Sequence, residues 1–160
     1  IGDAYGGGTL AYILQPGDPG YVPGEEHGLI ATVADVSSSA IWTSGVGSLV
    51  TTSALIGTGN QNTVNIIIVD ATLSIAARLC GDLVQGGYSD WYLPSQDELN
   101  KLYLNRVAIG GFTPGAYWSS TQENIIDGGF TQAFLQIFSS GNQNYASKGN
   151  AVNVRAIRSF

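Results

Sequence analysis

The 160-residue sequence predicts an α+β fold, in which strands from the two ends of the chain enclose two helices. Runs rich in β-branched and aromatic residues predict strands at 9–14, 27–34, 116–121, 130–138 and 152–158. Two segments between them, 64–80 and 95–106, repeat apolar residues at the spacing of one helix face. Because the termini of compact domains often lie close together, we expect the last strand to pair near the first.

The N-terminal part combines two strands with a long irregular stretch. Residues 9–14 and 27–34 are apolar enough to form buried strands, and three prolines interrupt the segment between them. Residues 35–63 are rich in Gly, Ser and Thr, with Trp42 as the expected hydrophobic anchor. A stretch of this length and composition is typical of binding loops.

The first helix is predicted for residues 64–80, with Asn62 or Thr63 as its N-cap. A strand is the alternative for residues 66–69, which are all β-branched. The helix is favoured because residues 71–83 form too long a segment for a strand. Its predicted buried face consists of Ile66, Val69, Leu73, Ala77 and Cys80.

Residues 88–99 predict a corner between a strand and a helix. An aromatic, strand-like run over residues 88–93 is followed by a proline and then by Ser95. The Ser95 side chain can accept from the backbone N–H of Glu98, and the Glu98 side chain can reach back, which makes a capping box. The buried face of the helix 95–106 is predicted at Leu99, Leu102 and Tyr103.

The C-terminal part predicts three strands joined by polar loops. Trp91 and Trp118 lie in the most aromatic motifs and are interpreted as core anchors. Residues 139–150, rich in Asn and Gly, predict a loop before the last strand. Arg155 and Arg158 lie on that strand, where we expect structural ion pairs.

The expected partners of those two arginines are Asp97 and Glu98. Such pairing favours a structural role over ligand binding for both guanidinium groups.

Composition narrows the possible functions. A net charge of −6 and a pI of about 4.4 give an acidic field that repels phosphate backbones, so we expect no nucleic-acid partner. Charged residues make up only 11%, and the many Gly, Ser and Asn residues are typical of exported surface proteins. No run approaches the roughly 18 apolar residues that a membrane span requires. The single cysteine, Cys80, excludes an internal disulfide and is interpreted as a small buried hydrophobe.

The sequence gives little support for a catalytic site or a metal site. His27, the only histidine, is interpreted as a residue at the start of a strand, and no Gly-x-Ser-x-Gly nucleophile motif is present. We therefore predict no enzymatic activity, no catalytic residue and no cofactor. Structural calcium is possible but less favoured than solvated loop carboxylates, because the spacing fits no EF-hand. The candidate calcium ligands are Asp18, Glu25, Glu123, Asn124 and Asp127.

The best candidates for ligand binding lie in the predicted loop beside the late strands. Amide side chains offer adaptable hydrogen bonds there, and a tyrosine offers a rigid aromatic platform. An ordinary hairpin loop explains the same residues equally well. The candidate ligand-binding residues are Asn142, Gln143, Asn144, Tyr145 and Lys148.

Several short motifs in the same order carry a resemblance to a known family. They are HGLI at 27–30, IGTGN at 56–60, YSDWYLPS at 88–95, YWSST at 117–121 and VRAIR at 154–158. With them the chain, from Gly6 onward, resembles the bacterial domain that ends the Legionella collagen-like adhesin. The resemblance implies one C-type-lectin-like domain over residues 1–160, a looped antiparallel sheet with two helices. This fold is shared with sulfatase-modifying-factor domains.

The resemblance also implies a function. It implies an extracellular or cell-surface module for recognition or adhesion that binds a glycan or a surface protein and forms a homo-oligomer, either a trimer or a filament. Sulfated glycans are ligands at the family level, although the acidic charge of this chain opposes them. The alternative is a structural subunit or tip domain of an extracellular filament or fibre. A sulfatase-modifying enzyme fits worst, because it needs a reactive thiol and only Cys80 is available.

Overall fold

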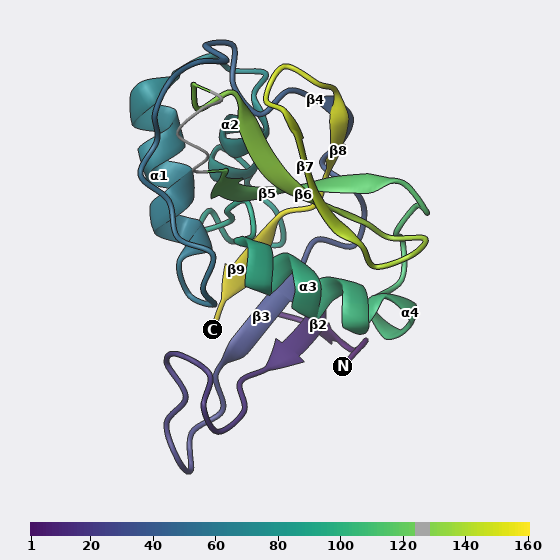
Figure 1. Ribbon diagram of the computed structural model, residues 1–160. Helices are drawn as coiled ribbons and strands as arrows, with labels where there is room; N and C mark the ends of the chain where they lie inside the picture. The colour runs from purple at the N-terminus through teal and green to yellow at the C-terminus, as the bar shows by residue number, and fades with distance from the viewer. Residues whose placement is uncertain (124–128) are drawn as a thin grey trace.

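A computed structural model describes residues 1–123 and 129–160, which form two β-sheets and four helices (Figure 1). The predicted α+β class is therefore confirmed. The first sheet has the order β1-β2-β3-β9, with bounds Ala4–Tyr5, Gly8–Ile13, Gly28–Ala31 and Ile157–Ser159. The second has the order β4-β8-β5-β6-β7, with bounds Ser37–Ala40, Val152–Val154, Ala116–Gln122, Gln132–Ile137 and Gln143–Ser147. The helices are α1 Gly59–Val69, α2 Ala76–Gly81, α3 Gln96–Leu104 and α4 Arg106–Ile109.

The two ends of the chain meet in the first sheet. Strand β9 pairs antiparallel with β3, with Ile30 opposite Arg158 and Ala31 opposite Ile157. The C-terminal strand thus returns to the N-terminal sheet, as the sequence predicted. In the second sheet β8 is parallel to β5, whereas β6 and β7 continue antiparallel.

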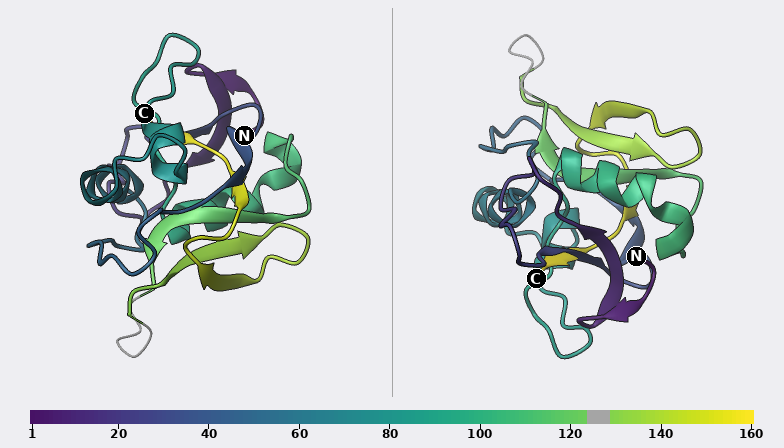
Figure 2. Two further views of the ribbon diagram at one scale, coloured as in Figure 1. Left: turned by 90° about the horizontal axis from the view of Figure 1, so that it is seen from above. Right: turned by 90° about the horizontal axis from the view of Figure 1, so that it is seen from below.

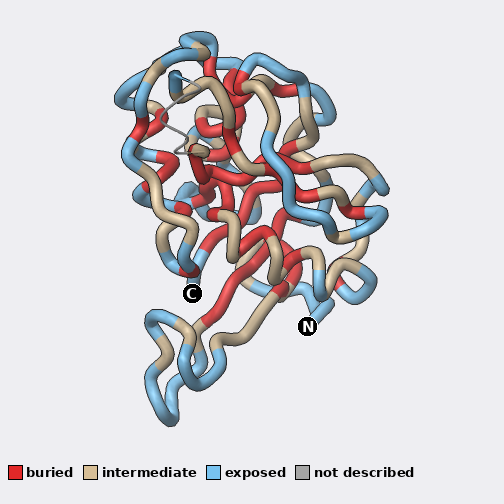
Figure 3. Tube along the Cα trace, viewed as in Figure 1, coloured by how far each residue is buried: buried red, intermediate tan, exposed pale blue. Residues whose placement is uncertain are grey.

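The helices cover different parts of this framework. Helix α1 packs on α2 and on β5 of the second sheet, whereas α3 touches β2 of the first sheet as well as β5 and β6 of the second (Figures 1 and 2). Buried residues concentrate where sheets and helices meet (Figure 3). None of the helices in the described part of the chain is long and apolar enough to cross a bilayer.

The predicted core anchors are confirmed. Trp42, Trp91 and Trp118 are at most 2% exposed, and all belong to one core cluster. The Trp118 indole donates to Ala40 O at 2.9 Å, and the Trp42 indole donates to Ser119 O at 2.8 Å. These bonds join segments almost 80 residues apart and satisfy both buried N–H groups.

The predicted helix over residues 64–80 is wrong in both its start and its continuity. Helix α1 already begins at Gly59, and Asn62 does not cap it but clamps Ser53 through two hydrogen bonds. The helix ends at Asp70, whose carboxylate accepts from the Ser44 N–H at 2.6 Å and from the Thr43 hydroxyl at 2.7 Å. These bonds tie Asp70 to a distant loop and draw the chain out of helical geometry.

Two residues that were predicted on the buried face of this helix are therefore exposed. Val69 and Leu73 are 45% and 71% exposed, whereas Ile66, Ala77 and Cys80 are buried as expected. The second helix, predicted for residues 95–106, is found as α3, and a short α4 that was not predicted follows it.

The predicted capping box at the start of α3 is present. The Ser95 hydroxyl accepts from the Glu98 N–H at 3.3 Å, and the Glu98 carboxylate accepts from the Ser95 N–H at 2.7 Å. The strand predicted just before it, over residues 88–93, is reduced to two isolated antiparallel bridges, from Tyr88 to Gln85 and from Tyr92 to Ile157.

The predicted strand over residues 152–158 is divided between the two sheets. Strands β8 and β9 are separated by Arg155 and Ala156, which are buried. The Thr32 N–H donates to Ala156 O at 3.0 Å, so this crossing is paired with a loop. The alternation of apolar and polar residues that suggested one strand holds from Val152 to Ala156 and breaks at Ile157, where β9 begins.

Candidate functional site

The predicted polar loop at 139–150 contains a strand, β7, in its middle. β7 pairs regularly with β6, with Phe134 opposite Tyr145 and Leu135 opposite Asn144. Only the turn before β7, which holds Asn142, and the end after it fit the predicted loop. Tyr145 is 50% exposed, and its ring meets the Phe134 ring edge-on at 6.3 Å between centroids.

The candidate residues on β7 point to two faces of the sheet. Gln143 faces α3, where its side-chain oxygen accepts from the Gln96 amide at 3.1 Å. Tyr145 shares that face, because side chains two residues apart in a strand lie on the same side. Asn144 points to the opposite face, and it is exposed there. The structure thus brings Gln143 and Tyr145 together and separates Asn144 from them.

Lys148 does not lie on this surface. Its side chain is fully buried, and its ammonium donates to Ser48 O at 2.7 Å and to the Gln122 side-chain oxygen at 2.6 Å. It also lies 4.6 Å from the centre of a Trp42 ring. Burial lowers the pKa of Lys148 to about 8. Lys148 therefore lies in the turn after β7, but its ammonium points into the protein and not toward a ligand at the surface.

The expected pairing of Arg155 and Arg158 with Asp97 or Glu98 is also wrong in its partners. Arg155 pairs with Asp35 at 2.8 Å, and Arg158 pairs with Asp90 at 2.7 Å. Glu98 is occupied by its capping box and by the Gly57 N–H. The structural role predicted for both arginines is retained.

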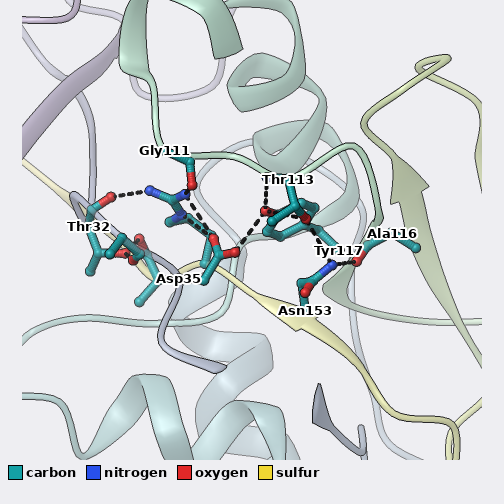
Figure 4. Close-up of polar contacts among 10 residues, drawn as sticks. Thr32, Asp35, Gly111, Thr113, Ala116, Tyr117 and Asn153 are labelled. Atoms are coloured by element: carbon teal, nitrogen blue, oxygen red, sulfur yellow. Dashed lines mark hydrogen bonds and ion pairs between the residues drawn. The ribbon is translucent and has the colours of Figure 1, made fainter. Parts of the chain in front are cut away.

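The Arg155 side chain organises a buried network between the sheets (Figure 4). Its guanidinium donates to Thr32 O at 2.7 Å, to the Asp35 carboxylate at 2.8 Å and to Gly111 O. The other Asp35 oxygen accepts from the Tyr117 hydroxyl at 2.9 Å. That hydroxyl in turn accepts from the Thr113 N–H at 2.8 Å. The network fixes the loop between α4 and β5, and its polar groups bond to one another.

The reactive side chains in the described residues are arranged for structure. Cys80 is fully buried, and burial raises its pKa, so the thiolate is not available as a nucleophile. His27 directly precedes β3, as predicted, and its ring contacts Phe160 O at 3.3 Å and the Glu25 carboxylate at 2.9 Å. Both acceptors raise the pKa of His27.

Among the described residues, the candidate calcium ligands Asp18, Glu25 and Glu123 are not gathered into one site. Within the described residues no group of three or more His, Cys, Asp or Glu side chains could hold a metal ion. Asp18 accepts from the Tyr12 hydroxyl at 2.5 Å, and Glu25 contacts His27. Asn124 and Asp127 lie outside the described residues.

The comparison with known families bears on this geometry. The family model described as the Lcl C-terminal domain matches residues 31–158, from the end of β3 into β9. The chain belongs to the Lcl C-terminal domain family. This family supplies the C-terminal domain of collagen-like surface proteins and is not an enzyme family. No curated protein matched the chain.

In this Lcl C-terminal domain the side of α3 that faces β6 and β7 adds two half-buried residues that the sequence did not single out. Gln96 contacts Gln143, and Asn100 accepts from the Gln136 amide at 2.9 Å. Their spacing of four residues, which puts both on one side of the helix beside the buried Leu99, is the sequence signal that could have found them.

Proposed function

We propose that the chain is a non-enzymatic, extracellular or cell-surface recognition module that binds a glycan or a surface protein through side chains on and beside β7. The observation that most directly supports this proposal is a set of exposed, uncharged side chains at the edge of a packed sheet. These are Asn142, Gln143, Asn144 and Tyr145. Membership of a family of collagen-like surface proteins supports the extracellular setting. The proposal requires no metal or cofactor.

The chemistry of these side chains suits recognition. Tyr145 presents half of its surface while Phe134 supports its ring, so little conformational freedom remains to be lost on binding. The amides of Gln143 and Asn144 can each donate and accept hydrogen bonds. Such a surface contributes specificity without relying on net charge.

Replacing Asn144 and Tyr145 together with alanine should weaken binding about tenfold or more, because binding surfaces depend on a few aromatic and polar anchors. The measurement is a glycan array and a bacterial or host cell-surface binding assay at physiological salt. The matched control is Val107→Ala on α4, which is 89% exposed and distant in sequence from β7. Undiminished binding by the folded double variant would reject this site.

A structural subunit of a filament is the second candidate function. It is favoured by apolar side chains that are exposed on and beside α1. Ile68 on α1 is 75% exposed, and Leu73 just after it is 71% exposed. The helix also carries no charged residue. Light scattering distinguishes the two candidates. A discrete monomer or trimer agrees with recognition, whereas open-ended polymers that Ile68→Lys abolishes would favour the filament.

A further inference from the structure

A groove lies along the side of α3 that faces the loop between β2 and β3. We call it the α3 groove, and its volume is about 270 Å³. Three segments that are far apart in sequence line it. Asp18 and Pro19 come from the first, Ile56 from the second, and Asp97, Asn100 and Lys101 from the third. Its size is close to the lower end of small-molecule sites, about 300–1,000 Å³, so it suits a ligand of one or two rings.

The polar groups in the α3 groove are only partly used by the protein. Among the described residues nothing hydrogen-bonds to the Asp97 carboxylate or to the Asn100 side-chain N–H₂. One Asp18 oxygen accepts both the Tyr12 hydroxyl and the Gln15 N–H, which leaves the other only its ion-pair contact with Lys101. Partial burial raises the pKa of Asp97, as expected for a carboxyl that has lost water without gaining a partner.

Lys101 decides which charge the groove can accept. Its ammonium donates to the Tyr12 hydroxyl at 3.0 Å and lies 3.8 Å from the Asp18 carboxylate. The ammonium therefore occupies the place beside Asp18 that a metal ion or an amine would take. An anion, in turn, would meet the carboxylates of Asp18 and Asp97. The groove therefore keeps free hydrogen-bond acceptors next to free hydrogen-bond donors. This combination matches neutral hydroxyl groups, because each hydroxyl both donates and accepts.

A second, apolar pocket of about 190 Å³ adjoins the α3 groove. The two share Pro19 and Ile56, and the second is lined further by Leu14, Leu29 and Phe160. A ligand that places hydroxyls in the α3 groove could therefore extend an apolar group past the wall formed by Pro19 and Ile56.

We propose that the α3 groove binds a neutral saccharide, with ring hydroxyls on Asp97, Asn100 and Lys101 and an apolar substituent toward the neighbouring pocket. This inference rests on the proposed recognition function and assigns it a ligand class and a second surface. Asn100 connects the two surfaces, because it lines the groove and also accepts from Gln136 on β6.

The test is an amide NMR titration of the 160-residue chain with the methyl glycosides of glucose, galactose, mannose and N-acetylglucosamine. At least one glycoside should bind with a dissociation constant of about 1 mM and shift the signals of residues 18–19, 55–57 and 97–101. Asp97→Asn and Asn100→Ala should each weaken that binding about tenfold, since the first replaces a charged acceptor with a neutral amide and the second removes a hydrogen-bonding group. Val107→Ala on α4, which is 89% exposed and does not line the groove, is the matched control and should leave it unchanged.

Thermal unfolding of each variant verifies that it folds, and the isosteric Asp97→Asn keeps the helix start intact. Glucosamine, glucuronate and Ca²⁺ complete the titration. Binding of any of these in preference to the neutral glycosides would overturn the inference, as would no binding up to about 50 mM. Saccharide shifts confined to β7 and lost in Asn142→Ala would also overturn it, while leaving the proposed recognition function intact.

Discussion

Replacing Arg155 with methionine should lower the free energy of unfolding by roughly 3–5 kcal/mol. The guanidinium is fully buried, and it holds Thr32 O, the Asp35 carboxylate and Gly111 O at once. Methionine preserves much of the contact with the Phe112 ring, 4.1 Å from the guanidinium carbon, but leaves the Asp35 charge without its cation. Urea denaturation near neutral pH measures the loss.

The matched control is Arg78→Met. Arg78 pairs with Asp82 at 2.7 Å, but this pair lies on a helix surface where the Asp82 side chain is 51% exposed. Such pairs contribute about 0.3–0.5 kcal/mol, so this variant should differ little from the parent protein. Adding Asp35→Asn to Arg155→Met should recover part of the stability, because it removes the unpaired charge. Equal losses in Arg155→Met and Arg78→Met would contradict the structural role assigned to Arg155.

The features that the sequence predicted well are those that depend on neighbouring residues. The capping box needs only Ser95 and Glu98 three residues apart, and it forms as predicted. The strand over residues 116–121 is likewise found in β5, because its aromatic residues fit a buried sheet in most contexts. The burial of the three tryptophans follows from their size.

The features that the sequence missed depend on partners far along the chain. Helix α1 ends where Asp70 bonds to residues 43–44, and nothing within the run 64–80 signals this contact. β7 is polar and resembles a loop, but pairing with β6 makes it a strand. The α3 groove joins three separated segments, so no local pattern could reveal it. Tertiary context therefore overrides local propensity at the end of α1 and at the candidate surfaces.

The stability of the protein should rise with pH between about 7.5 and 9.5 because of Lys148. Burial lowers its pKa from 10.5 to about 8, so across this interval the unfolded chain binds more protons than the folded one. Raising the pH then favours the folded state, by about 2 kcal/mol over the interval. Lys148→Met removes the titrating group, and its unfolding free energy should lack this increase.

The difference in unfolding free energy between the parent protein and Lys148→Met isolates the contribution of Lys148 from that of other titrating groups. Burial raises the pKa of Cys80, which opposes the rise as the unfolded thiol ionises, but this effect is the same in both proteins. Urea titrations at several pH values measure both free energies. Parallel pH profiles would show that the Lys148 ammonium titrates as it does in water, and would contradict its burial between Ser48, Gln122 and Trp42. A rise in the unfolding free energy of the parent protein alone would show that Lys148 titrates inside the protein, at the end of β7 and away from the exposed residues before it.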